Sequence, residues 1–509
     1  MGFQLPTTRR RYYGAASSES LLILLRVCWT GCMEPRDEEM SSWLEREVAG
    51  CQFQDIRHGK RFRTLLEQLS RQIGGSIPFA CQDWAATKAA YRFLSNARVD
   101  ESKILAGHFL CTRDRFAATA GHPVLVLHDT TEFSYHRGDP EAIGILKKLA
   151  SPYASGGQPG HYTSCGVLMH SSLVVTGDGL PLGLAAIKFW TRDKFYGANE
   201  LKRSINPTRV PIEQKESFRW LENVRQSTAL LAEPARIIHI GDRESDIYEL
   251  FSIAHQVGTH FLLRTCVDRL AGDGDHTVAD EMRELRVQGL HRVEVRDKKG
   301  GVNEAVLELR YRRIRVLAPV AKQKMYPPLM LTVLHATERD PPKGREPIDW
   351  KLVTDLPIGS RKEAIEKLNW YAMRWKIETF HKILKSGCKA EDVKLRTAER
   401  LVNVIAMFCL LSWRVFWMTM LNRTTPEASP QMALTPTEIY LLDQLVSDPP
   451  SLGSAANPLS LYLTKLARLG GYLARAKDPP PGNTVMWRGM ARLTDIQLGF
   501  ILGTQLVGN

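Results

Sequence analysis

Three acidic residues that lie far apart along the chain are candidates for one shared chemical role. Asp129 and Asp242 each follow a short apolar run, and Glu378 lies in a charged helical stretch. Carboxylates without cysteine or histidine partners are the ligands that Mg²⁺ and Mn²⁺ prefer. Two such ions can stabilise the attacking and leaving oxygens of an in-line displacement at phosphorus. We therefore expect the three acids to converge and to hold two Mg²⁺ ions in one active site, with Mn²⁺ as a possible substitute.

Glu378 is accompanied by three further polar residues at fixed spacing: Tyr371, Arg374 and Lys385. At 3.6 residues per turn, all four side chains would project from one face of a continuous helix. Arg374 and Lys385 could then bind phosphates next to the reacting one, and Tyr371 could hydrogen-bond another. An exposed helix face crossed by salt bridges is the alternative interpretation of this segment taken alone.

The segments that precede the two aspartates are predicted to be buried strands. Val124–His128 is a continuous apolar run that ends at Asp129, and Arg236–Ile240 is a second run that ends shortly before Asp242. In open α/β sheets, functional groups gather at the carboxyl ends of such strands. A single aspartate at a strand end also commonly caps a turn or a helix, so this alternative stays open for each residue.

The remaining pattern predicts a mixed α/β fold. Helices are expected at Ile212–Leu231 and from about 244 to 257, and the chain is rich in strand patterns from about 260 to 357. We interpret that stretch as a β insertion in the α/β domain, followed by one long helix over about 361–384. The other predicted strands are Gly166–Val175, Leu182–Phe189, His291–Val295, Ala305–Val316, Leu329–Leu334 and Trp350–Val353.

A length of 509 residues suggests about three domains. The apolar stretch Leu401–Met420 contains Ser412 and Arg414, so we expect a buried helix and no membrane-spanning segment. Residues 1–40 remain unassigned, and an over-long translation start, with Met33 or Met40 as the natural first residue, is the favoured interpretation. The predicted domains are a helical domain at 41–115, an α/β catalytic domain at 116–423 and a helical domain at 424–509.

Charge points to a polyanionic partner. The formal net charge is +13 and the pI is near 9.3, and lysine and arginine displace counterions from phosphate backbones. Within the helical segment before residue 110, basic residues gather that could contact DNA, although a solvated helix face is the alternative. The nine cysteines are scattered without C-x-x-C pairs, which indicates neither a disulfide framework nor a zinc site and fits a reducing cytoplasm. The candidate DNA contacts are Arg57, Lys60, Arg61 and Arg92.

These residues match a known family. The Y-(2)-R-(3)-E-(6)-K pattern formed by Tyr371, Arg374, Glu378 and Lys385 is the hallmark of the DDE transposases of the insertion-sequence-four family, which this chain resembles. The resemblance runs from about residue 41 to the C-terminus. It extends to the stretches His128–Thr131, Gly241–Asp246, Ala90–Leu94, Lys215–Ser217 and Ala467–Gly471.

The resemblance implies a fold and a set of partners. The core would be RNase H-like, interrupted by the β insertion before the third acid. The N-terminal helical domain would bind the inverted-repeat ends of a transposon, and the C-terminal helices would pair two protomers in a homodimer. Trp350 lies in the insertion, where the family places a tryptophan that stacks on a flipped-out base.

The implied activity is cut-and-paste DNA transposition in the bacterial cytoplasm. Water would nick one strand at each end of the double-stranded transposon DNA. The freed 3′-hydroxyl would form a hairpin by attacking the opposite strand, and after hairpin opening it would join target DNA. Two other interpretations were weighed: a non-catalytic DNA-binding regulator of transposition, and a metal-dependent nuclease or phosphatase of another family. The three intact acids argue against the first, and the residues that surround Glu378 argue against the second.

Overall fold

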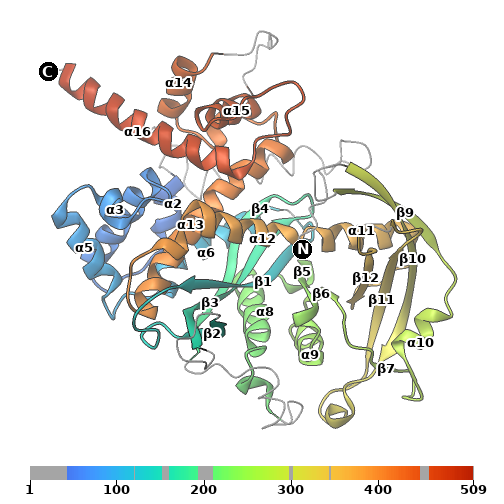
Figure 1. Cartoon of the computed structure of the whole chain (residues 1–509). Coiled ribbons are helices and arrows are strands. Elements are labelled where there is room, and N and C mark those ends of the chain that lie inside the picture. Colours follow the sequence, from blue (N-terminus) through green and yellow to red (C-terminus); the bar gives the residue numbers. More distant parts are fainter. Residues whose placement is uncertain are drawn as a thin grey trace.

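The computed structural model describes residues 43–119, 121–151, 160–192, 210–296, 302–342, 345–447 and 458–507. The predicted N-terminal extension, residues 1–40, lies outside the described residues. A 12-stranded mixed sheet forms the centre of the molecule, with helices on both of its faces (Figure 1). The predicted mixed α/β architecture is therefore confirmed.

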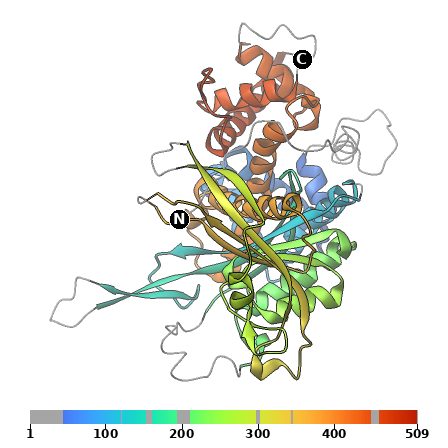
Figure 2. The same ribbon diagram turned by 90° about the vertical axis from the view of Figure 1, so that its right-hand side faces the viewer.

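Strand β1 lies at the centre of this sheet. It pairs antiparallel with β3 on one side and parallel with β5 on the other, and β5 pairs parallel with β6. Strands β2 and β4 pair with different halves of β3, and β2 projects with its half of β3 as a teal ribbon in Figure 2. The bounds are β1 Val124–Tyr135, β2 Ile145–Ser151, β3 Gly160–Thr176, β4 Pro181–Trp190, β5 Ile237–Gly241 and β6 His260–Arg264.

The strands of the predicted β insertion continue the same sheet. Strand β12 pairs antiparallel with β6, β11 pairs with β12, and β10 pairs with β11. The insertion therefore extends the central sheet outward, as the yellow strands of Figure 1 show, and β6 itself lies beside β5. The bounds are β7 Leu270–Ala271, β8 His276–Thr277, β9 Gly289–Arg296, β10 Val302–Val316, β11 Leu329–Glu338 and β12 Asp349–Thr354.

The apolar side chains of β1 point alternately to the two faces of the sheet, so helices cover both faces. Leu125 and Leu127 share a buried cluster with residues of α12 and α13, whereas Val124 and Val126 pack with the end of α8. In the N-terminal half the helices are α2 Trp43–Ala49, α3 Ile56–Arg71, α4 Ile77–Cys81, α5 Trp84–Leu94, α6 Glu101–Ala117, α8 Phe218–Leu231, α9 Tyr248–Val257 and α10 Val278–Arg283. The others are α11 Arg361–Ala372, α12 Trp375–Lys382, α13 Ala398–Thr424, α14 Pro436–Leu445, α15 Leu459–Leu469 and α16 Asn483–Val507.

Helix α13 is the buried helix expected at Leu401–Met420. It is long and apolar enough to cross a membrane, but its most apolar window is entirely buried inside the protein. Arg414 is also buried, and its guanidinium donates to the carbonyl of Ala433. Helix α13 is therefore a buried helix, as predicted.

Several expected elements have different bounds in the structure, and two of them carry candidate site residues. The strand predicted to end at Asp129 continues to Tyr135, because β3 offers antiparallel partners along its whole length. The long helix expected over about 361–384 is interrupted: α11 ends at Ala372, a turn follows, and α12 begins at Trp375. The prediction of one continuous helical face for Tyr371 through Lys385 is therefore wrong.

A buried ionic network ties α2 to the core. The Glu47 carboxylate, 2% exposed, forms an ion pair with Arg115 and accepts a hydrogen bond from His108 Nδ1 at 2.5 Å. His108 Nε2 accepts from the backbone N–H of Leu184 at 2.9 Å, and burial lowers the pKa of His108 to about 3, so its ring is neutral. Arg115 also donates to the Leu182 carbonyl at 2.8 Å. One carboxylate thus links two helices to β4.

We predict that Glu47→Gln destabilises the protein by roughly 3–5 kcal/mol, because it leaves the Arg115 charge buried without a counter-ion. Thermal or urea unfolding of the full chain measures this change. Glu45→Gln is the matched control, since Glu45 lies on the same helix and pairs with Arg63 near the surface. There we expect a loss of less than about 1 kcal/mol. Equal losses in the two variants would contradict the assignment.

Candidate active site

The two predicted aspartates lie at equivalent positions on neighbouring parallel strands. The parallel pairing of β1 and β5 ends with Leu127 opposite Ile240. Asp129 and Asp242 each lie two residues beyond that pair, and neighbouring strands are about 5 Å apart. Asp129 follows Leu125 and Leu127 in the alternation of β1, which directs its side chain to the face covered by α12.

Asp242 is positioned by a sharp turn at the end of β5. A Cβ on Gly241 would lie 2.4 Å from Ser245 Oγ and 2.9 Å from the ring of Trp220, so the turn leaves no room for a side chain. Asp242 then begins a short 3-10 helix, and its Oδ1 accepts from the Glu244 backbone N–H at 2.9 Å. Asp242 therefore caps a short helix, which is the alternative that the sequence leaves open. It does so at the end of β5, on the side where the other acids lie.

Arg374 connects the first and third acids. It lies in the turn between α11 and α12, and its guanidinium forms an ion pair with Glu378. Arg374 Nη1 also lies 3.6 Å from Asp129 Oδ1. The structure thus brings Asp129 and Glu378 to one cation although the predicted continuous helix is broken, because the turn and the first turn of α12 still place Arg374 and Glu378 together.

Histidine 381, which we had not singled out, also contacts Asp129. His381 Nδ1 lies 3.6 Å from Asp129 Oδ2, and its Nε2 lies 2.8 Å from Ser171 Oγ on β3. The ring is hydrogen-bonded to Ser171 and lies beside the Asp129 carboxylate. The sequence offered a signal for this residue, because His381 follows Glu378 by about one helical turn and therefore lies on the same side of α12.

Burial and charge raise the pKa of Asp242. Desolvation is the main cause, and the negative charge of Asp129 adds to it, while the hydrogen bond from the Glu244 backbone and the cations Arg374 and Arg219 oppose it. Burial likewise raises the pKa of Glu244, which forms an ion pair with Arg219 at 2.6 Å. The site therefore concentrates negative charge. Sequence reasoning missed Glu244, although it lies within a quoted motif, and Arg219, for which no signal existed.

The donor set fits a hard divalent cation, but the geometry is not that of a formed metal site. Across the described ranges, no group of three or more His, Cys, Asp or Glu side chains is arranged to hold a metal ion. The Arg374 guanidinium instead offsets the charge of Asp129 and Glu378. Carboxylate oxygens from three elements remain the ligand type that Mg²⁺ favours.

Tyr371 and Trp350 form a pair beside the acids. Their rings meet edge to face with centroids 5.4 Å apart, which joins α11 to β12 of the insertion. Tyr371 is buried and Trp350 half-buried. Lys385 lies in a π-helical turn that follows α12, and its ammonium sits 5.6 Å from the ring centre of Phe133 on β1. All four residues of the predicted pattern therefore border one region of the sheet.

The four candidate DNA contacts in the N-terminal domain lie on α3 and α5. Arg57 is exposed and forms an ion pair with Asp55 at 2.7 Å, which is the N-cap of α3. Lys60 is exposed and Arg61 half-buried on the same helix. Arg92 is exposed on α5 and lines an open hollow. Its other lining residues include Lys88, and also Arg400 and Trp84, which the sequence did not single out.

Trp84 marks this hollow as a candidate nucleic-acid contact. Its ring is 75% exposed, and the Lys88 ammonium lies 4.4 Å from the ring centre. An exposed indole next to basic residues can contact sugars and bases while the cations contact phosphates. A family model described as transposase DNA-binding matches residues 40–99, which span α2 to α5.

The chain therefore carries a transposase DNA-binding domain. The match supports a DNA-binding transposase with DNA as its partner. It covers Arg57, Lys60, Arg61 and Arg92 and ends before the first of the three acids.

We predict that Asp242→Asn stabilises the metal-free protein at neutral pH by roughly 1–2 °C in Tm, because it removes a buried charge from a crowded site. A carboxyl group whose pKa is raised on folding favours the folded state at low pH and loses that contribution as pH rises through the raised pKa. The gain should therefore disappear when the melting temperatures are measured at acid pH. Asp178→Asn, in the exposed turn after β3, is the control and should show no such dependence. A gain that persists at acid pH would refute the electrostatic explanation.

Proposed function

We propose that the protein is a cut-and-paste DNA transposase of the insertion-sequence-four DDE family, closest to the transposase of transposon five. The observation that carries this proposal is the convergence of Asp129 and Glu378 on Arg374, with Asp242 in register on the neighbouring strand. The transposase DNA-binding match at residues 40–99 supports the same conclusion from a separate part of the chain.

The strand order supports an RNase H-like core. Numbered along the chain without β2 and without strands β7 to β12, the central strands run third, second, first, fourth and fifth across the sheet, as β4, β3, β1, β5 and β6. Strand β6, which the predicted insertion included, thus belongs to the central set. The first three are antiparallel neighbours, and the last two run parallel to the first. In this arrangement the first and fourth strands carry Asp129 and Asp242 to one edge.

Each acidic residue has a defined role in this proposal. Asp129, Asp242 and Glu378 would hold two Mg²⁺ ions, with Mn²⁺ as a possible substitute, and the bound ions would activate the nucleophile and stabilise the leaving oxygen. Arg374 would exchange its carboxylate contacts for a DNA phosphate, since guanidinium binds both groups through paired donors. Lys385 would contact a second phosphate, and His381 would keep Asp129 oriented.

The reaction is a series of displacements at phosphorus. In each, an oxygen nucleophile loses a proton and forms a P–O bond, while the opposite P–O bond breaks and its oxygen takes up a proton. Water is the nucleophile when a strand is nicked and when the hairpin is opened. The 3′-hydroxyl is the nucleophile when the hairpin forms and when the transposon end joins target DNA. The geometry required is the same each time, so one site can perform all four steps.

Trp350 and Tyr371 suit the strained hairpin step. The two rings already contact each other beside the acids, and Trp350 keeps part of its indole accessible. We propose that a base extruded from the transposon end stacks on Trp350, which contributes roughly 1–3 kcal/mol. Tyr371 would hold the indole in position and donate a hydrogen bond to a nearby phosphate.

The C-terminal helices supply a face for a second copy. Helices α14, α15 and α16 lie together beyond α13, and the end of α16 points away from the body of the protein (Figure 1). Four apolar residues near that end are 38–52% exposed. Tyr440 of α14 packs on one of them, Phe500, with ring centres 5.7 Å apart. An exposed apolar face of this kind suits a homodimer. The residues on α16 are Leu498, Phe500, Ile501 and Leu502.

We predict that Asp129→Asn and Glu378→Gln each reduce nicking of transposon ends by at least ~100-fold while end binding stays unchanged. The substrate is a duplex that carries an inverted repeat flanking the coding region, with Mg²⁺ for cleavage and a chelator for binding assays. Glu366→Gln, an exposed acid on α11, is the matched control and should cleave normally.

The same assay separates the competing functions. Retained nicking in both variants would overturn the assignment of the acids. A wild-type protein that binds ends but never cleaves them would be a non-catalytic regulator. Hydrolysis without joining of 3′-ends to target DNA would favour a nuclease of another family.

For the N-terminal domain, we predict that Arg92→Ala weakens binding to duplex DNA roughly threefold to tenfold and lowers the slope of log K against log[salt] by about one. Fluorescence anisotropy at several salt concentrations measures both quantities. Arg113→Ala is the control, because Arg113 is exposed on α6 and lies outside the matched domain. An unchanged salt slope in Arg92→Ala would remove Arg92 from the DNA contact.

A further inference from the structure

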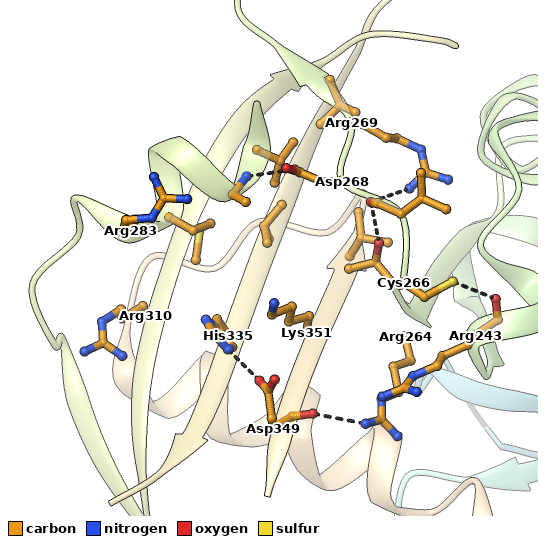
Figure 3. A pocket seen from close by; sticks show the side chains of 18 of the residues that line it. Arg243, Arg264, Cys266, Asp268, Arg269, Arg283, Arg310, His335, Asp349 and Lys351 are labelled. Carbon is orange, nitrogen blue, oxygen red and sulfur yellow. Dashed lines mark hydrogen bonds and ion pairs between the residues drawn. The ribbon is translucent and has the colours of Figure 1, made fainter. Parts of the chain in front are cut away.

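A pocket of about 670 Å³ is lined by strands of the insertion and by the segment that follows β6 (Figure 3). Trp350 and Leu352 of β12 face α11 and the main core, so their neighbours Asp349, Lys351 and Val353 face the other way and line this pocket. The pocket is therefore separate from the Trp350–Tyr371 pair, although it borders the same sheet.

The inner wall of the pocket is apolar. It belongs to the second buried cluster, formed by α9, α10 and the strands of the insertion. At its edge, Val267 is 49% exposed. The apolar residues of the wall are Phe251, Val278, Met282, Val316, Val333 and Val353.

The rim carries an excess of positive charge. Six lysine and arginine residues line the pocket, and three of them pair with carboxylates: Arg269 with Asp246, Arg283 with Asp280 and Arg310 with Glu308. Two aspartates also line it. Both aspartates are engaged: Asp268 accepts from the Ala279 backbone N–H at 3.0 Å, and Asp349 accepts from His335 at 2.6 Å. Within the described part of the chain, no carboxylate lies at ion-pair distance from Arg243, Arg264 or Lys351.

Two basic residues of the pocket come from segments next to Asp242. Arg243 directly follows Asp242, and Arg264 ends β6, next to the strand that leads to Asp242. Arg264 also donates to the Asp349 carbonyl at 3.0 Å, which fixes it at the border between core and insertion. Figure 3 shows Arg243 and Arg264 reaching in from the core side, with Lys351 extending across the middle.

The loop that forms one wall is held rigidly. Asp246 Oδ2 accepts hydrogen bonds from Thr265 Oγ1 and from the backbone N–H groups of Cys266 and Val267, at 2.8–2.9 Å. Its Oδ1 forms an ion pair with Arg269 at 2.6 Å. A buried carboxylate with four such partners pre-forms the wall, so a ligand need not order it.

We propose that this pocket binds an unpaired nucleotide of a DNA strand that passes through the active site. An apolar wall with a cationic rim matches a base and its phosphate. A duplex stacks its bases inside and presents mainly phosphates and sugars, so it has no base face to offer to the wall. The position beside Asp242 places the bound nucleotide on the strand whose phosphate lies at the acids. This inference rests on the proposed function for the identity of the strand.

Cys266 provides the test because its thiol is exposed and lines the pocket. The full-length protein, with a chelator present, is labelled with a maleimide, and modification of Cys266 is followed by peptide mass spectrometry. Three probes are compared: a short oligodeoxythymidylate, a blunt duplex of the same strand length, and thymidine 5′-monophosphate. At a concentration tenfold above its Kd, the oligonucleotide should slow labelling of Cys266 by roughly tenfold. The duplex and the free nucleotide, each at that same concentration, should not.

A charge-reversal variant tests whether protection of Cys266 depends on the basic residues that line the pocket. Lys351→Glu should abolish protection by the oligonucleotide, whereas Lys362→Glu, an exposed lysine on α11 outside the pocket, should retain it. Protection that survives Lys351→Glu, or no protection at saturating oligonucleotide, would overturn the proposal. Equal protection by the duplex or by the free nucleotide would overturn it as well.

The outcome is independent of the catalytic assay. Because no metal is present, loss of nicking cannot alter the labelling. If protection holds while Asp129→Asn still nicks transposon ends, the proposed function fails and the nucleotide site stands. If protection fails while Asp129→Asn abolishes nicking, only the nucleotide site is refuted.

Discussion

The mutual repulsion of carboxylates at one edge of the sheet is the constraint on which the rest of the site depends. Asp129 and Asp242 each lie two residues beyond the end of the parallel pairing of β1 and β5, and Glu378 of α12 shares the Arg374 cation with Asp129. Arg374 offsets part of this charge through its contacts with Asp129 and Glu378, and the pKa of Asp242 is still raised by burial and by Asp129. A site in this electrostatic state favours cations, which is the property that phosphoryl transfer requires.

The scaffold behind the acids is built to be rigid. On the opposite face of β1 from Asp129, His128 lies 2.9 Å from His239 and 2.9 Å from Ser172 Oγ. Burial lowers the pKa of His128 to about 3, so the cluster stays neutral and adds no charge behind the site. Hydrogen bonds across three strands thus fix the backbone that carries Asp129, and His381 lies beside its carboxylate. Such support keeps reacting groups in a productive geometry.

The sequence predicted the central elements because their signals are local. Apolar runs located β1, β3, β4 and β5, and an apolar stretch with a buried arginine located α13. The break between α11 and α12 had no such signal, since no glycine or proline marks it and the chain there reads as helix throughout. Arg219 could not be found either, because its role arises from tertiary contacts with Thr130 and Glu244 that lie far from it in the sequence. The pairing of β12 with β6, which joins the insertion to the core sheet, is likewise a tertiary outcome.

The central claim is that three acids share a pair of divalent ions against DNA. Electron paramagnetic resonance of Mn²⁺ bound to the protein and a transposon-end duplex tests it most directly, since two ions about 3.5–4 Å apart are magnetically coupled. The account predicts a coupled pair in each protomer that is lost when any one of the three acids is neutralised. Isolated, uncoupled Mn²⁺ that is insensitive to those changes would contradict it.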